Sequence, residues 1–196
     1  MNKIKLQGLL LAGLGTFSYA ASAHTGLLPT GGFSHGFQHP LLGLDHFLAM
    51  LGLGLWASSQ SRRLTQQAIS VFLLFMTAGA LFGLAGVGFA YVETGILVSL
   101  LSVGVALSFG TAKLPKAIIL TSIAAFAAMH GLAHGSALPV GASAYAYIAG
   151  IVSGTATSHV SGLVLGLIAQ HVNATGFIRV YGTMTGVIGA WLLLAA

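Results

Sequence analysis

The sequence predicts an all-α integral membrane protein, with six transmembrane helices after a cleavable signal peptide. Its composition excludes a soluble domain. Of the 196 residues 56% are hydrophobic and only 5% are charged, whereas a soluble domain carries about 25% charged residues. Six apolar segments follow the N-terminal region, and each is near or above the roughly 20 residues that a span needs. The formal net charge of +5 comes from basic residues at the ends of these segments, so it does not indicate a nucleic-acid partner.

The N-terminus has the organisation of a signal peptide: a basic start, a short apolar stretch and a small-residue cleavage site that ends at Ala23. We expect residues 1–23 to be the signal peptide and residues 24–196 to form a single six-helix transmembrane domain. Cleavage after Ala23 would make His24 the mature N-terminus. Its free amine and imidazole could then chelate a divalent metal ion together.

The apolar segments are expected at residues 40–58, 68–91, 94–111, 117–136, 141–170 and 176–195. Pro40 suits the first turn of the first helix, where its missing N–H costs nothing. The fifth segment is long enough to tilt or break. Before the first segment, the glycine-rich stretch HTGLLPTGGFSHGFQHP predicts an irregular, re-entrant segment.

The loops predict the topology. A secretory signal places the mature N-terminus outside, so the first, third and fifth loops face the cytoplasm. These three loops carry every basic residue of the mature chain: Arg62, Arg63, Lys113, Lys116 and Arg179. Glu93 is the only charged residue in the loops expected outside, and it is acidic. The positive-inside rule therefore predicts six spans with both mature termini outside.

Small residues and missing motifs narrow the classes of function. Pairs of glycines four residues apart let helix backbones approach closely in lipid, and they occur at Gly79 and Gly83, Gly150 and Gly154, and Gly162 and Gly166. This spacing predicts packing and not a substrate. The chain has no cysteine, which excludes a disulfide framework and thiolate metal sites. It has no Walker-type loop, so this chain does not hydrolyse ATP.

The stretch HPLLGLDHF places ionisable residues inside the first apolar segment. On a continuous helix seven residues make about two turns, so His39 and His46 would share one face. Gly43 would leave a gap in that face for an ion or another backbone. Asp45 at this depth is typical of a transport pathway or a bound ion; an Asp–His pair that only pins two helices is the structural alternative. His35, upstream, is either a loop residue or a further ligand.

A second cluster, MHGLAHGSALP, lies at the end of the fourth segment. His130 and His134 are four residues apart and share a helix face, so they could chelate one divalent ion. The glycine after each histidine would keep that face open. The fifth segment adds His159 at greater depth, whereas His171 is expected to be an interfacial residue only.

This donor set predicts the class of ion. Imidazole with one carboxylate suits nickel, cobalt, zinc or copper(II), and it suits magnesium or calcium poorly. Several neutral histidines could also release an ion that thiolates would retain. The candidate ligands are His24, His35, His39, Asp45, His46, His130, His134 and His159.

These residues resemble two motifs of the HupE/UreJ family of nickel/cobalt permeases, and the resemblance extends over nearly the whole chain. The family's H-P-x-x-G-x-D-H motif is matched by His39, Pro40, Gly43, Asp45 and His46. Its H-G-x-A-H-G-x-E motif is matched by His130, Gly131, Ala133, His134 and Gly135, and a fifth-span histidine followed by glycine is matched by His159 and Gly162. The second motif ends here in Ala137 instead of glutamate. This departure removes a carboxylate that bears on metal preference and proton coupling.

The resemblance implies a secondary transporter or facilitator, not an enzyme, that takes up Ni²⁺ or Co²⁺ across the bacterial inner membrane. Zn²⁺ is a further candidate, and no permanently bound cofactor is expected. The expected partners are the metal ion, the lipid bilayer and a downstream metallochaperone or metalloenzyme maturation system, with no nucleic acid. The sequence does not give an oligomeric state.

Two other hypotheses fit part of the pattern. His159, Gly162 and Gly166 resemble the histidine helix of rhomboid proteases, but the matching G-x-S-G is absent. Such a protease needs a serine activated by the histidine. Paired histidines on two helices could also be axial haem ligands of a b-type cytochrome. Neither hypothesis explains the adjacent Asp45 and His46.

Overall fold

The computed structural model describes residues 32–195, and all regular elements in that range are α-helices. They are α2 (Gly32–Leu42), α3 (Leu44–Ala57), α4 (Arg62–Leu84), α5 (Val92–Phe109), α6 (Lys116–Ser136), α7 (Ala144–His171) and α8 (Gly176–Ala195). The expected signal peptide and His24 lie outside the described residues.

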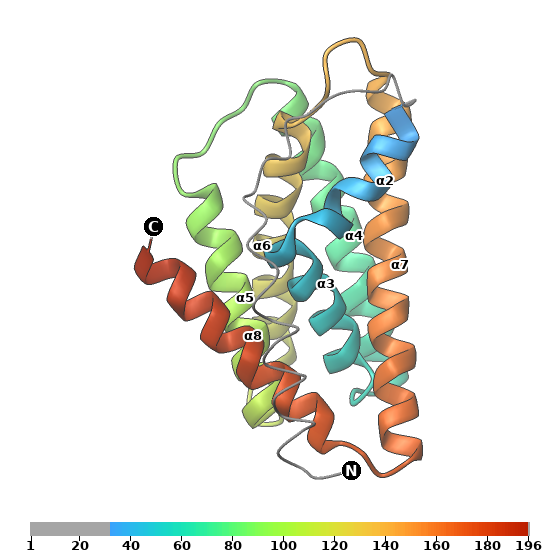
Figure 1. The fold of residues 1–196 in the computed structure, drawn as a ribbon, viewed down its shortest axis with the longest axis vertical. Helices are drawn as coiled ribbons and strands as arrows, with labels where there is room; N and C mark the ends of the chain where they lie inside the picture. Colours follow the sequence, from blue (N-terminus) through green and yellow to red (C-terminus); the bar gives the residue numbers. More distant parts are fainter. Residues whose placement is uncertain (1–31, 196) are drawn as a thin grey trace, which may run out of the picture.

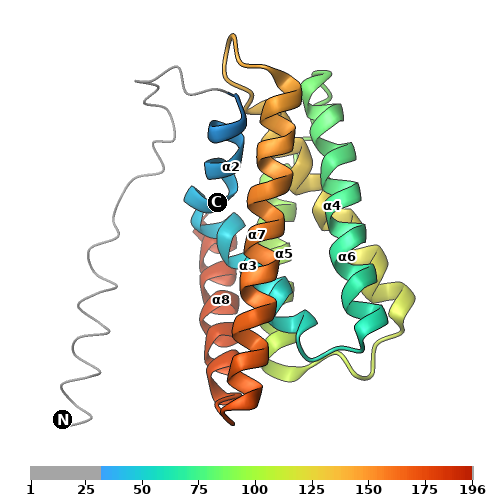
Figure 2. The ribbon, with the colours of Figure 1, turned by 90° about the vertical axis from the view of Figure 1, so that its right-hand side faces the viewer.

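Helices α4, α6 and α7 run along the long axis of the bundle, whereas α8 crosses this axis obliquely (Figures 1 and 2). Helix α4 packs on α6, α5 packs on α8, and α2 and α3 follow one another along the length of α7. The loops that follow α3, α5 and α7 lie at one end of the bundle (Figure 1), and all five basic residues of this part of the chain lie in or next to these loops. We call this the basic end.

The structure confirms an all-helical membrane protein. Within residues 32–195, five helices are long and apolar enough to cross a membrane, and the count rises to six if the bent pair α2–α3 is one span. The fifth predicted segment does not break, because α7 is one continuous helix of 28 residues.

The prediction of one continuous helix at residues 40–58 is wrong, because two helices, α2 and α3, occupy this part of the chain. Helix α2 already begins at Gly32, so the described part of the stretch expected to be irregular, residues 32–40, is helical, and Pro40 lies in the last turn of α2. The chain then bends by 81° between α2 and α3. Gly43 stands at the bend with an extended backbone (φ −75°, ψ 112°) and is the N-cap of α3. His39 and His46 therefore do not share a face of one continuous helix.

The second and third segments are also shifted. Helix α4 starts at Arg62, because the hydroxyl of Ser61 accepts the backbone N–H of Leu64 at 3.4 Å and caps the helix. It ends at Leu84, since Gly86 turns the chain with a φ of +80° that glycine readily adopts. Helix α5 begins at Val92, two residues before the expected start of the third segment.

The glycine pairs lie at helix contacts, as the spacing predicts. A Cβ at Gly79 or Gly83 would collide with the backbone of α6, one at Gly150 or Gly154 with α2, and one at Gly162 with α3. Gly131 and Gly135 were expected to keep a ligand face open. That expectation is wrong, because both glycines instead contact the backbone of α4 at Met76 and Ala80.

Candidate metal-binding site

The bend at Gly43 brings both predicted clusters together. His39 from α2 and His46 from α3 both contact His134 of α6, with ring centroids 5.1 Å and 4.6 Å away. His46 also contacts His130 one turn along α6, at 4.8 Å. His35 lies one turn before His39 on α2, and their rings are 6.0 Å apart. We call these five residues, together with Asp45, the histidine cluster.

Burial increases along the cluster. His35 and His39 are partly exposed. The side chain of His46 is 13% exposed and that of Asp45 is 26% exposed, whereas His130 and His134 are fully buried. The cluster thus runs from a partly open face at α2 into the centre of the bundle.

Asp45 fixes the orientation of His46. Its Oδ1 lies 3.0 Å from Nδ1 of His46 and also accepts the backbone N–H of His46 at 2.9 Å. A carboxylate only accepts, so Nδ1 of His46 carries a proton. In the neutral ring Nε2 of His46 therefore has a free lone pair. A Cβ at Gly43 would lie only 3.3 Å from this carboxylate oxygen and 3.4 Å from Nδ1 of His46.

Ser99 of α5 fixes His130 in the same way. The Ser99 hydroxyl donates to the Ile96 carbonyl at 2.7 Å, so its oxygen can only accept from Nε2 of His130, 3.0 Å away. The proton of neutral His130 is then on Nε2. Its Nδ1 carries the lone pair.

His159 lies beyond the histidine cluster, on α7. Its Nδ1 donates to the Met50 carbonyl at 2.8 Å, which leaves the lone pair on Nε2. The Phe72 ring of α4 contacts both His159 and His130 of the cluster. The centroid of Phe72 lies 5.9 Å from that of His130 and 4.8 Å from that of His159.

The exposed His171 at the end of α7 is not part of this arrangement, as the sequence predicts.

Five ring nitrogens of these histidines are buried and have no hydrogen-bond partner among the described residues. They are His46 Nε2, His130 Nδ1, both nitrogens of His134, and His159 Nε2. An unsatisfied buried polar atom is costly, and most native proteins have few of them. In three of the rings the free nitrogen is opposite one that donates a hydrogen bond. Metal-binding histidines typically have this arrangement.

The rings contact one another edge-on or tilted, and they do not converge on one point. Within residues 32–195 no three of the candidate side chains already form a metal-binding group. The described residues therefore supply free, oriented donor atoms along a chain of contacts. A metal ion would have to turn two or more of these rings to be held by three ligands at once.

Two residues near the cluster were missed at the level of sequence. Tyr147 of α7 is fully buried, contacts the rings of His35 and His39, and donates its hydroxyl to the His134 carbonyl at 3.1 Å. Ser99 lies 31 residues before His130. Serine and tyrosine in apolar segments give no pattern of their own, so only the packing identifies them.

The chain is similar to known proteins over most of its length. Residues 11–192 match the family described as HupE / UreJ protein. Protein HupE of Rhizobium leguminosarum bv. viciae is 34% identical to the chain over 135 residues, which cover 69% of this chain and 70% of that protein. No solved structure matches the chain.

Proposed function

Because the chain belongs to the HupE/UreJ family, we propose that it is a secondary transporter or facilitator that takes up a divalent transition-metal ion, Ni²⁺ or Co²⁺. The proposed location is the bacterial inner membrane. The ion would be delivered to a metallochaperone or a metalloenzyme maturation system on the inner side.

The buried, unpartnered ring nitrogens are the observation that supports this proposal. They lie on α3, α6 and α7, and His46 and His130 each hold their one proton on the opposite nitrogen. Neutral imidazole is a borderline ligand that suits nickel, cobalt, zinc and copper(II). Asp45 would supply negative charge where a divalent ion would otherwise be poorly stabilised.

The order of the contacts supports a stepwise path. In this proposal His35 and His39 capture the ion at the partly exposed end, with His24 assisting if the signal is cleaved after Ala23. The ion then passes to Asp45 and His46. His130 and His134 hold it next, before it moves past Phe72 to His159. Each step would break few bonds, because a neutral imidazole ring offers one lone pair to a metal ion.

The other two hypotheses find less support. A rhomboid-like protease needs a serine hydroxyl on its histidine, but Nε2 of His159 has no hydrogen-bond partner among the described residues. Axial haem ligation uses at most one histidine on each side of the iron, so it leaves most of the unpartnered ring nitrogens unexplained. Membership of a family of transporters favours neither.

Metal uptake by cells tests the proposal. Cells that express the wild type, His46→Ala, Asp45→Asn or an empty vector would receive trace Ni, Co, Zn, Cu and Mn together, and cell-associated metal would be measured by mass spectrometry. We expect the wild type to gain nickel or cobalt. His46→Ala should lose most of that gain because a free nitrogen is removed, and Asp45→Asn because the charge and the strong acceptor are removed.

His171→Ala is the matched control, because this histidine is exposed and outside the cluster. It should retain uptake. Membrane amounts of each variant would be compared by immunoblot. Normal uptake by both His46→Ala and Asp45→Asn would overturn the assigned site, and no gain of any metal by the wild type would overturn the transport function.

A further inference from the structure

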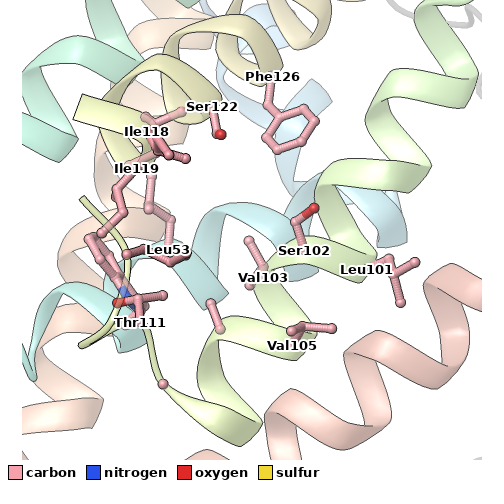
Figure 3. Close-up of a pocket in the computed structure, with 15 residues that line it drawn as sticks. Leu53, Leu101, Ser102, Val103, Val105, Thr111, Ile118, Ile119, Ser122 and Phe126 are labelled. Carbon is pink, nitrogen blue, oxygen red and sulfur yellow. The ribbon is translucent and has the colours of Figure 1, made fainter. Parts of the chain in front are cut away.

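A second feature lies outside the histidine cluster, between α5 and α6 near the basic end. It is a cavity of about 440 Å³, a size typical of ligand sites. Figure 3 shows side chains of α6, among them Ile118 and Ser122, across the cavity from Ser102 and Val105 of α5.

The walls of this cavity are apolar, and it opens toward the outside of the bundle. Its floor includes the buried side chains of Leu53, Trp56 and Ile119. On its rim Val105 is 49% exposed and Ile118 is 53% exposed. No charged residue lines it. The outer rim of a transmembrane helix pair faces lipid, so an apolar chain could enter from the side.

The dimensions match one leaflet of a bilayer. The lining residues of α6 extend from Ile118 to Phe126, which is about 12 Å at a rise of 1.5 Å per residue. Half of the hydrocarbon core of a bilayer is about 15 Å thick. Trp56 lies at the end of the cavity next to the α5–α6 loop, because its indole N–H donates to Thr111 of that loop at 3.0 Å. Tryptophan is enriched at membrane interfaces, so this end of the cavity is expected near the membrane surface.

Positive charge lies at the same end. The α5–α6 loop contributes Thr111 and Leu114 to the cavity lining, and the neighbouring Lys113 and Lys116 are exposed. No acidic residue occurs between positions 94 and 196 of the chain, and Glu93 lies in the first turn of α5, at the other end of that helix from these lysines. Basic sites between transmembrane helices bind anionic lipid headgroups.

We propose that this cavity binds one acyl chain of an anionic phospholipid, whose headgroup contacts Lys113 and Lys116. The inference is independent of metal transport. A zwitterionic lipid of the same chain length would fill the cavity less often, because it lacks the net negative charge that the two lysines attract.

Tryptophan fluorescence offers a direct test, because the chain has only two tryptophans. Trp191 on α8 is 65% exposed, and Trp191→Phe leaves Trp56, at the cavity, as the only reporter. This variant would be reconstituted in bilayers that contain either brominated phosphatidylglycerol or brominated phosphatidylcholine with the same chains. Bromine quenches indole at short range. We expect stronger quenching of Trp56 by brominated phosphatidylglycerol at equal bromine content.

Four further variants in the Trp191→Phe background distinguish the effect of charge from the effect of the cavity. Lys113→Gln with Lys116→Gln should remove the difference between the two lipids. Ser122→Phe or the milder Ala106→Leu should fill the cavity and reduce quenching by both. Arg179→Gln, a basic residue near the same end but on α8, is the charge control and should leave the preference intact. Circular dichroism would show that each variant keeps its helices.

Equal quenching by the two lipids would overturn the proposed preference for an anionic headgroup. Absence of quenching by either lipid would overturn an acyl chain as the occupant, and would instead favour a protein segment at this face. Unchanged quenching in both filled variants would show that the quencher reaches Trp56 by another route, which also overturns the proposal.

Discussion

At the scale of single residues, the protons of the buried histidines are set by neighbours that are not themselves candidate ligands. Ser99 and the Met50 carbonyl each accept one ring N–H. The lone pairs of His130 and His159 are thereby directed to the opposite nitrogen. Such supporting contacts commonly change metal affinity by about 10- to 100-fold.

Ser99→Ala tests this role. Without the Ser99 oxygen, Nε2 of His130 has no fixed acceptor, so the ring can turn and its proton can move to the ligand nitrogen. We expect the apparent affinity for nickel or cobalt uptake to fall by about 10-fold, with little change in the amount of protein in the membrane. Uptake would be measured against external metal concentration.

The control for this variant is Ser102→Ala, on the same helix. The Ser102 hydroxyl is exposed and, within residues 32–195, bonds only to the Val98 carbonyl. It should leave the affinity unchanged. If both serine variants lose the same affinity, the effect comes from α5 as a whole and not from the proton on His130.

Ala137 is the second residue that calls for a test, because the resembled motif has glutamate there. It caps the C-terminus of α6, and its N–H donates to the His134 carbonyl at 3.1 Å. Ala137→Glu would restore a carboxylate one turn from His134. We expect a severalfold lower half-saturating metal concentration, since a carboxylate lowers the cost of holding a divalent ion in a low-dielectric site.

Ala137→Gln has a similar shape without the charge and provides the comparison. If Ala137→Gln improves uptake as much as Ala137→Glu, charge is not the cause. If neither variant changes uptake, the departure from the motif does not limit transport.

At the scale of elements, glycines decide how closely α3 and α7 approach. A Cβ at Gly162 would collide with the backbone of α3 at Leu51 and Leu55, and one at Gly54 with the backbone of α7 at His159. The same contact holds the Met50 carbonyl within reach of His159. Packing and ligand geometry therefore depend on one helix interface.

Gly162→Ala should separate these helices, because backbone atoms cannot move aside as a side chain can. We expect a loss of stability of about 1–3 kcal/mol, measured as a lower unfolding temperature in detergent, together with reduced uptake. Gly186→Ala, on α8, is the matched control. A Cβ there meets only an ordinary contact with Gly104 at 3.6 Å, so its unfolding temperature should not fall; an equal fall in both variants would contradict the assigned interface.

The helices and the histidine motifs could be predicted from the sequence, but the bend at Gly43 and the contacts between helices could not. Hydropathy located the five helices that are long and apolar enough to cross a membrane, and residue spacing placed His130 and His134 on one face. The bend at Gly43 was missed, because a single glycine in an apolar run is often tolerated within a helix. Ser99 and Tyr147 were missed because each meets the cluster from another helix, a relation that local pattern does not contain.

At the scale of the whole molecule, the distribution of basic residues predicts the orientation. All five basic residues of the described chain lie near the end of the bundle that holds the loops after α3, α5 and α7. The positive-inside rule predicts that this end faces the cytoplasm. In that orientation the histidine cluster would lie nearer the outer face, where an ion would be captured.

Fusions at the C-terminus test this orientation. Alkaline phosphatase after Ala196 should be active and green fluorescent protein there should be dark, because the C-terminus is expected outside. The same fusions after Lys113, in the α5–α6 loop, should give the opposite pattern. A fluorescent C-terminal fusion would reverse the orientation and place the histidine cluster on the cytoplasmic side.

The bend between α2 and α3 also affects how the membrane voltage acts on the ion. A helix end leaves backbone groups without partners inside its own helix, and such groups are tolerated at membrane depth only against protein or water. If water follows His35 and His39 as far as Gly43, the voltage drops mainly across the remaining part of the bundle. About 2.3 kcal/mol per charge for each 100 mV would then act on a divalent ion mostly between His46 and the basic end. The inward-negative potential would drive the step from the histidine cluster past Phe72, and would contribute little to capture.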